Sequence, residues 1–198
     1  MNLIAIETIS EVCSISLFEK NKNVDTIESS NDIKHTKNLP ILFNKLINRN
    51  SFDIKNIDYI AVSIGPGSYT GIKVGVNFSK GLAFGLGIPI IPINSLEAIN
   101  YNLNCKEEYY IALYSHKDFV YYQKYENGLS KSIQKCESVE KLDNLKIFGF
   151  NLNKIPSIKY EQIILSSINI GKFASMNYLD LGTKDYDSIS SLCISRVG

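Results

Sequence analysis

The chain has 198 residues, enough for one large domain or two small ones, and 44% of them are hydrophobic, which is ample for a packed core. Lys and Arg total 21 against 20 Asp and Glu, so no overall positive field draws the chain to nucleic acid or to an anionic membrane. The first residues show no signal-peptide pattern and no apolar run is long enough to span a bilayer, so we expect a cytoplasmic protein without membrane attachment. No C-x-x-C pair occurs among the cysteines, which are Cys13, Cys105, Cys136 and Cys193.

The first half of the chain predicts an α/β unit. Strand-like runs cover residues 3–7, 13–18 and 23–29, and an amphipathic helix over 38–49 follows, with Pro40 tolerable only in its first turn. An apolar strand over 59–64 leads through a glycine-rich loop into a helix that ends near Leu86, and another strand covers 88–91. We expect the last two strands to be parallel and joined by a right-handed crossover.

The second half repeats this order in a shorter form. We expect a short helix over 95–103, a hairpin over 109–114 and 119–125, a third strand over 131–133, a short helix over 138–142, a strand over 146–149 and a helix over 166–178. The pattern predicts two subdomains, 1–100 and 101–198, related by a weak internal duplication. The tyrosines of the hairpin could belong to the core, to cross-strand pairs or to the surface.

The segment Gly65-Pro66-Gly67-Ser68-Tyr69-Thr70-Gly71 is the most informative part of the chain, because it joins an apolar strand directly to an unusual helix. Either Ser68 or Thr70 can cap that helix. Small residues recur at every fourth position of the helix and form one stripe along it, which comprises Gly71, Gly75, Ser79, Ala83 and Gly87. Such a stripe lets another backbone approach closely. It indicates either tight packing inside the subunit or contact with a second protein.

The local sequences around this loop resemble the TsaB (YeaZ) family, a branch of the superfamily of actin, Hsp70 and sugar kinases (ASKHA). The matching segments are Ile4-Ala5-Ile6-Glu7-Thr8, Cys13-Ser14-Ile15-Ser16-Leu17, His35-Thr36 with Leu39-Pro40, and Gly65 to Lys73, continued by Gly81-Leu82-Ala83. The resemblance implies an α/β fold of two ASKHA-like β-β-β-α-β-α subdomains, the second copy reduced. It also implies a non-catalytic subunit of the complex that adds threonylcarbamoyl to an adenosine of tRNA.

The same resemblance implies a set of partners. A TsaD-like catalytic subunit would hold the metal and the ATP, a TsaE-like ATPase would dock on the pair, and tRNA would be met only through the complex, so that this chain needs no cofactor. We expect the partner to cover the helix over 38–49 and the small-striped helix, and a homodimer to form through this face when the partner is missing. The candidate interface residues are Leu39, Leu42, Phe43, Leu46, Gly71, Val74, Gly75, Phe78, Ser79 and Leu82.

Two enzymatic alternatives remain. An ASKHA-type phosphotransferase would bind nucleotide phosphates between the first hairpin and the glycine loop, where the candidates are Glu7, Thr8, Gly65, Gly67 and Ser68. The turn that contains Ile9 and Glu11 argues against this function, because it lacks the small residues that close approach to phosphate needs. A glycopeptidase-like metalloprotease needs convergent ligands, whereas His35 and His116 form no H-E-x-x-H pair, so we expect no metal site. We expect His35 to bond a backbone group near the first helix.

Overall fold

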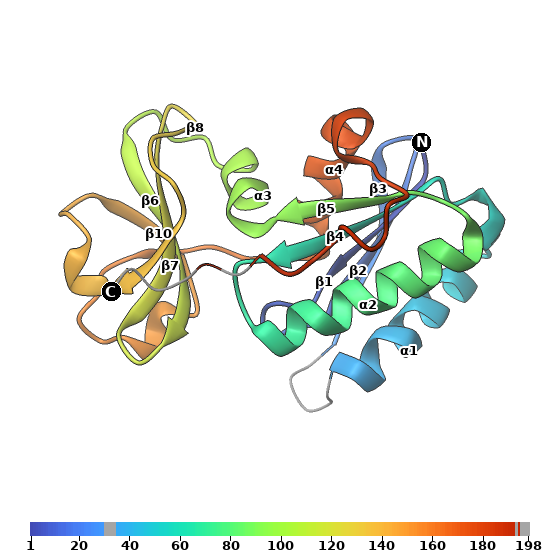
Figure 1. Ribbon diagram of the computed structural model, residues 1–198, viewed down its shortest axis with the longest axis horizontal. Helices are drawn as coiled ribbons and strands as arrows, with labels where there is room; N and C mark the ends of the chain where they lie inside the picture. Colours follow the sequence, from blue (N-terminus) through green and yellow to red (C-terminus); the bar gives the residue numbers. More distant parts are fainter. Residues whose placement is uncertain (30–34, 193, 195–198) are drawn as a thin grey trace.

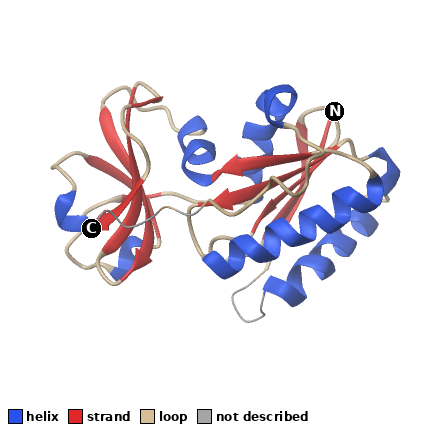
Figure 2. Cartoon of the chain, viewed as in Figure 1, coloured by secondary structure: helices blue, strands red, loops and turns tan. Residues whose placement is uncertain are grey.

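Two mixed β-sheets, one from each half of the chain, organise the fold (Figures 1 and 2). The computed structural model describes residues 1–29, 35–192 and 194, so Cys193 lies outside the described part. The first sheet has the strand order β3-β2-β1-β4-β5, and its strands are β1 (Leu3–Glu7), β2 (Ser14–Glu19), β3 (Lys22–Glu28), β4 (Tyr59–Gly65) and β5 (Ile90–Asn94). β1, β4 and β5 pair in parallel, as the sequence predicts for β4 and β5, whereas β1, β2 and β3 form an antiparallel meander.

Helices cover both faces of the first sheet. α1 (His35–Arg49) and α2 (Tyr69–Leu86) lie on one face, and α4 (Ser167–Leu181) lies on the other beside the short α3 (Ser95–Tyr101) (Figure 1). β1 accordingly has no polar face: Ile4 and Ile6 pack with α1 and α2, while Leu3 and Ala5 pack with α4. A 3-10 turn, η1 (Ile54–Asn56), leads into β4. None of the helices in the described ranges combines the length and apolarity needed to cross a membrane.

The second sheet repeats the order of four strands of the first. Its strands are β6 (Glu108–His116), β7 (Phe119–Glu126), β8 (Leu129–Ser130), β9 (Lys135–Ser138), β10 (Lys146–Phe150) and β11 (Glu161–Gln162), in the order β11-β10-β6-β7-β8, with β9 also paired to β7. β6 and β7 are antiparallel, while β6, β10 and β11 are parallel. The predicted duplication is therefore confirmed, with β6, β7, β10 and β11 in the places of β1, β2, β4 and β5.

Two helices of the second copy are reduced to single turns. η2 (Val139–Lys141) stands where the first copy has α1, and η3 (Leu152–Lys154) stands where it has α2. The strand expected over 131–133 is absent, and β8 and β9 lie on either side of that segment. Side-chain bonds explain the difference, because the Lys124 N–H donates to the Ser132 hydroxyl at 3.0 Å and the Gln123 amide donates to the Ser132 carbonyl at 2.9 Å. Of the hairpin tyrosines, Tyr109 and Tyr125 are fully buried and stack on each other in the core.

The end of the described chain returns to the first lobe, so the expected division into 1–100 and 101–198 does not match the packing. Ile170 and Ala174 of α4 are buried against β1, β2 and β5, so α4 covers one face of the first sheet. Residues 182–192, here called the C-terminal strap, then run beside β5 and α2 (Figure 1). The second lobe consists of residues 108–162 around the second sheet.

The C-terminal strap is held at several points. Thr183 and Ile90 exchange backbone hydrogen bonds of 2.8 and 2.9 Å, and the Leu192 N–H donates to the Ile64 carbonyl at 2.8 Å. The Tyr186 hydroxyl donates to the Ile88 carbonyl at 2.8 Å, and Ile189 is only 4% exposed within the core beneath α2. The strap is therefore part of the first lobe.

We predict that Ile189→Ala lowers the free energy of unfolding by about 2–4 kcal/mol, because a core isoleucine is truncated and leaves a cavity. Ile164→Ala is the matched control, since Ile164 is 76% exposed and its truncation should change stability by less than about 0.5 kcal/mol. Urea unfolding measures both. Equal effects of the two substitutions would show that the strap adds nothing to the core.

Candidate functional site

The glycine loop between β4 and α2 has a backbone that requires glycine. Gly65 has φ +108° and Gly67 has φ +156°. A Cβ atom at Gly65 would lie 2.8 Å from Ile72 Cδ1, and one at Gly67 would lie 2.9 Å from Ile9 Cβ. Ser68 caps α2, because its hydroxyl accepts a 3.3 Å hydrogen bond from the Gly71 N–H. The loop is thus a close-packed turn that starts α2.

The turn after β1 lies directly on this loop. The Thr8 hydroxyl donates to the Gly71 carbonyl at 2.8 Å, and the Ser68 N–H donates to the Ile9 carbonyl at 3.2 Å. The Ile9 side chain is 6% exposed and packs against Gly67. The space over Gly67 is therefore filled by the protein's own side chain.

Glu7 holds the turn after β1 in place. It is fully buried, and its carboxylate accepts hydrogen bonds from the Ile9 N–H at 2.5 Å, the Ser10 N–H at 3.1 Å and the Ser10 hydroxyl at 2.8 Å. These bonds favour the ionised form, but desolvation outweighs them and raises the pKa of Glu7 to about 7. The structure brings together the nucleotide candidates Glu7, Thr8, Gly65, Gly67 and Ser68, yet it turns the first two inward and so does not fit a phosphate.

A cleft of about 580 Å³ opens between the lobes in front of this loop. The Glu11 carboxylate from the first lobe and the Lys154 ammonium from the second form an ion pair of 2.8 Å at this cleft, and the ammonium lies 5.0 Å from the Tyr114 ring centre. His35 also lines the cleft. Its Nε2 donates a hydrogen bond to the Ser10 carbonyl at 2.9 Å, which is the backbone bond expected for this histidine. Within the described ranges, no three His, Cys, Asp or Glu side chains are grouped to hold a metal ion.

The small stripe of α2 faces the inside of the protein, not a partner. A Cβ atom at Gly71 would lie 2.0 Å from the Thr8 carbonyl oxygen, and a Cβ atom at Gly75 would lie 2.4 Å from the Thr8 hydroxyl oxygen. Ser79 and Ala83 are fully buried, and Gly87 only ends the helix. Three expected interface residues, Gly71, Gly75 and Ser79, are therefore corrected to internal packing positions. The fully buried Leu39 and Leu46 of α1 also belong to the core.

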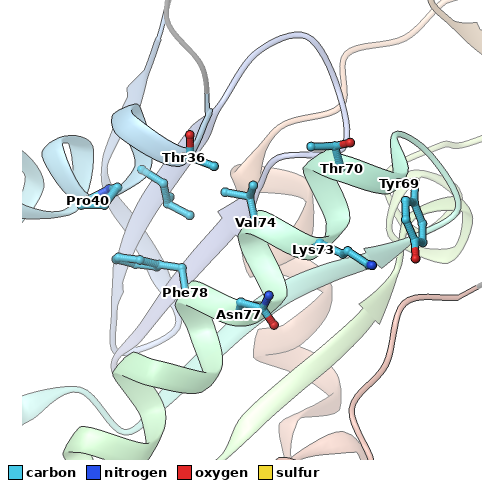
Figure 3. A pocket seen from close by; sticks show the side chains of 9 residues that line it. Thr36, Pro40, Tyr69, Thr70, Lys73, Val74, Asn77 and Phe78 are labelled. Atoms are coloured by element: carbon cyan, nitrogen blue, oxygen red, sulfur yellow. The ribbon is translucent and has the colours of Figure 1, made fainter.

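The remaining expected residues lie around the junction of the two helices, here called the α1–α2 face. Val74, Phe78 and Leu82 of α2 are half-buried, and the Phe43 ring of α1 meets the Phe78 ring edge to face at 5.9 Å. Leu42 is only 7% exposed and belongs to the core, as Leu39 and Leu46 do. A hollow of about 360 Å³ lies between the helices (Figure 3). It is lined by Thr36, Leu39, Pro40, Tyr69, Thr70, Lys73, Val74, Asn77 and Phe78.

Sequence reasoning missed the outward glycines of α2. Gly81 and Gly85 are exposed, and a Cβ at either would meet no atom within 4 Å. They lie four residues apart beside the α1–α2 face, next to Phe84, which is 75% exposed. Glycine inside a helix costs about 1 kcal/mol relative to alanine, and nothing within the described chain offsets that cost here. The sequence signal for these glycines was the segment Gly81-Leu82-Ala83-Phe84-Gly85, in which two glycines four residues apart lie on a different face of the helix from the inward stripe.

Comparison with known proteins gives a family assignment. The profile of the TsaD family, described as tRNA N6-adenosine threonylcarbamoyltransferase, matches residues 29–193. The chain belongs to the TsaD family, within its TsaB (YeaZ) group. Both curated relatives below are named tRNA threonylcarbamoyladenosine biosynthesis protein TsaB. The Haemophilus influenzae protein is 32% identical over 50% of this chain and 42% of its own length, and that of Buchnera aphidicola subsp. Acyrthosiphon pisum is 25% identical over 83% and 73%.

The fold agrees with this family. The structure of YeaZ from Pseudomonas aeruginosa superimposes with a TM-score of 0.81 at 19% identity, over 98% of this chain and 99% of that one. The matched segment nevertheless spans less than half of the Haemophilus protein. The resemblance to the TsaB (YeaZ) family and the predicted α/β fold with its internal duplication are confirmed by these matches and by the two sheets.

The buried Glu7 predicts a pH-dependent stability. Its pKa rises from 4.5 in an exposed state to about 7 in the fold, so the native state binds more protons between these values and the free energy of unfolding falls as pH rises through that window. The wild-type value minus that of Glu7→Gln should drop by about 2–3 kcal/mol from pH 5 to pH 8. Urea unfolding of both proteins at the two pH values measures it, and a constant difference would contradict this titration.

Two glycines of α2 offer a matched pair. Gly71→Ala should lower the free energy of unfolding by about 2 kcal/mol or more, because the methyl group overlaps the Thr8 carbonyl oxygen. Gly81→Ala should raise it by about 1 kcal/mol, because the helix gains propensity and the methyl group meets nothing. Thermal or urea unfolding gives both values. Shifts of the same sign would refute the orientation of α2 described above.

Proposed function

We propose that this chain is a non-catalytic subunit in the biosynthesis of threonylcarbamoyladenosine in tRNA, and that it binds and positions a TsaD-like catalytic subunit through the α1–α2 face. The single observation that carries this proposal is that face itself. It combines half-buried aromatic and aliphatic side chains, a hollow and two exposed helical glycines, in a chain of the TsaB group. Metal and ATP chemistry belong, in this proposal, to the partners.

The packing of the glycine loop supports a non-catalytic role. A phosphate at a helix N-terminus needs free N–H groups and room for close approach. Here the Ser68 N–H is bonded to the Ile9 carbonyl, and the Ile9 side chain occupies the space over Gly67. In the neighbouring cleft, the Lys154 ammonium is already paired with the Glu11 carboxylate, so the pair presents no net positive charge to an anion. These features disfavour the phosphotransferase alternative.

The α1–α2 face fits a helical partner. Exposed glycines let a second helix approach the α2 backbone, and the neighbouring Val74, Phe78 and Leu82 supply apolar surface for it to cover. Two helices from each partner would then form a four-helix interface. When the partner is absent, a second copy of this chain can cover the same surface. A TsaE-like ATPase completes the proposed complex, and tRNA binds only to the assembly.

Gly81→Leu separates assembly from folding. The isolated variant should be at least as stable as the wild type, because leucine favours a helix more than glycine and its side chain meets no neighbour. Its affinity for the purified catalytic subunit of the same organism should fall at least tenfold, because the side chain holds the partner helix away. Calorimetry gives the affinity, and a reconstituted tRNA threonylcarbamoylation assay should lose activity at limiting subunit concentration.

Lys172→Leu is the matched control, because it adds the same side chain to an exposed position of α4 on the other face of the sheet. It should leave affinity and activity unchanged. Wild-type affinity of Gly81→Leu would refute close helix approach at this face. Gly75→Leu is unsuitable as a test, because its side chain collides with Thr8 and would disturb the fold itself.

A further inference from the structure

The internal duplication leaves one face of the second sheet without its helices. In the first copy, α1 and α2 supply 15 and 18 helical residues over that face. In the second copy, the equivalent positions carry η2 and η3, each of three residues, followed by an irregular segment over 155–160. The apolar residues beneath them are Tyr110, Ala112, Val120, Tyr122, Ile147, Leu152 and Ile155.

A hollow of about 510 Å³ remains between η2 and the irregular segment, here called the second-lobe hollow. Val139, Leu142 and Leu145 line one wall, Ile158 lines the other, and Ile147 of β10 forms part of the floor. In the first copy, the groove between α1 and α2 occupies the equivalent place, because η2 replaces α1 and the segment after β10 replaces α2. The two hollows are therefore related by the duplication.

Charges flank the apolar lining of the second-lobe hollow. Glu140 and Asp143 stand on the η2 side, and Lys159 stands on the segment opposite. The Asp143 carboxylate accepts a hydrogen bond from the Tyr110 hydroxyl at 3.1 Å. Within the described part of the chain, the carboxylate of Glu140 and the ammonium of Lys159 have no hydrogen bond or ion pair. The carboxylate side disfavours an anionic occupant such as nucleic acid and favours a cationic one.

We propose that the second-lobe hollow binds an amphipathic helix of a partner protein, whose apolar face covers the lining and whose basic flank lies against Glu140 and Asp143. The repeat supplies the reason for a helix: the same arrangement of strands in the first copy is covered by helices with apolar residues at helical spacing. The charges determine how the helix is oriented, because its basic flank lies beside Glu140 and Asp143. This second interface is separate from the α1–α2 face and does not depend on the function proposed for it.

Synthetic peptides test this proposal with the full-length protein. The first is about 18 residues long, five helical turns, with leucines at i, i+3, i+4 and i+7 and lysines along one flank. The second has the same composition in an order without an apolar face, and the third has glutamates in place of the lysines. Fluorescence anisotropy should show that the first binds at least tenfold more tightly than either of the others.

Charge reversal then locates the binding. Glu140→Lys should weaken the lysine peptide at least fivefold and strengthen the glutamate peptide. Glu107→Lys is the matched control, because it makes the same charge change at an exposed position outside the hollow and should alter neither affinity beyond twofold. Added catalytic subunit should not displace the lysine peptide.

Three results would each overturn the proposal. They are equal binding of the first two peptides, an unchanged peptide preference in Glu140→Lys, and displacement by the catalytic subunit, which would put the peptide on the α1–α2 face instead. Circular dichroism of Glu140→Lys should match the wild type, since the substituted side chain is exposed. Loss of the folded spectrum would transfer the test to Lys159→Glu, which adds a carboxylate to the hollow and should strengthen binding of the lysine peptide and weaken that of the glutamate peptide; unchanged affinities would overturn the proposal.

Discussion

The first lobe depends on the close approach of the turn after β1 to the backbone of α2. At Gly71 there is no room for even a methyl group, because an ideal Cβ would lie 2.0 Å from the Thr8 carbonyl oxygen. The Thr8 hydroxyl bonds the Gly71 carbonyl across the same contact. This contact fixes the rotation of α2 about its axis, and the rotation decides which side chains it buries. Gly75, Ser79 and Ala83 must then face the sheet, and Gly81 and Gly85 must face outward.

The same contact changes what an ASKHA-like fold offers at this place. A glycine loop before a helix N-terminus is suited to anions, but here Glu7 pins a turn whose Ile9 side chain fills the space over the loop. The pinning carboxylate is wholly desolvated, which costs free energy that the tight packing around it must offset. A scaffold can tolerate such a filled loop, whereas a nucleotide site cannot. The filled loop inside the first lobe therefore supports the proposed role as a binding subunit.

The sequence predicted the parts of the fold that depend on local pattern. β1, β4 and α2 follow from apolar runs and a cap, and the repeat of a hairpin followed by a further strand follows from the pattern of the second half, whereas β9 and β11 were not expected. It could not predict that α4 packs on the first sheet, because an amphipathic helix specifies an apolar face without specifying which sheet it covers. It also could not orient α2, since two small-residue spacings lie on one helix and only the Thr8 contact distinguishes them. The segment over 131–133 failed as a strand because the Gln123 side chain bonds its Ser132 carbonyl and the Ser132 hydroxyl takes the Lys124 N–H that a neighbouring strand would use.

The C-terminal strap has a consequence for how the chain acquires its structure during synthesis. The sheet begins with residues near the start of the chain, yet its core includes Ile189, and its edge is paired with Thr183. Contacts between residues so distant in sequence form slowly, because a long loop must close before they contribute. A ribosome releases the amino end well before the strap. The lobe that leaves the ribosome first is thus the last to be completed. Until the strap has been synthesised, the sheet edge and the apolar core surface that it will cover are available to chaperones.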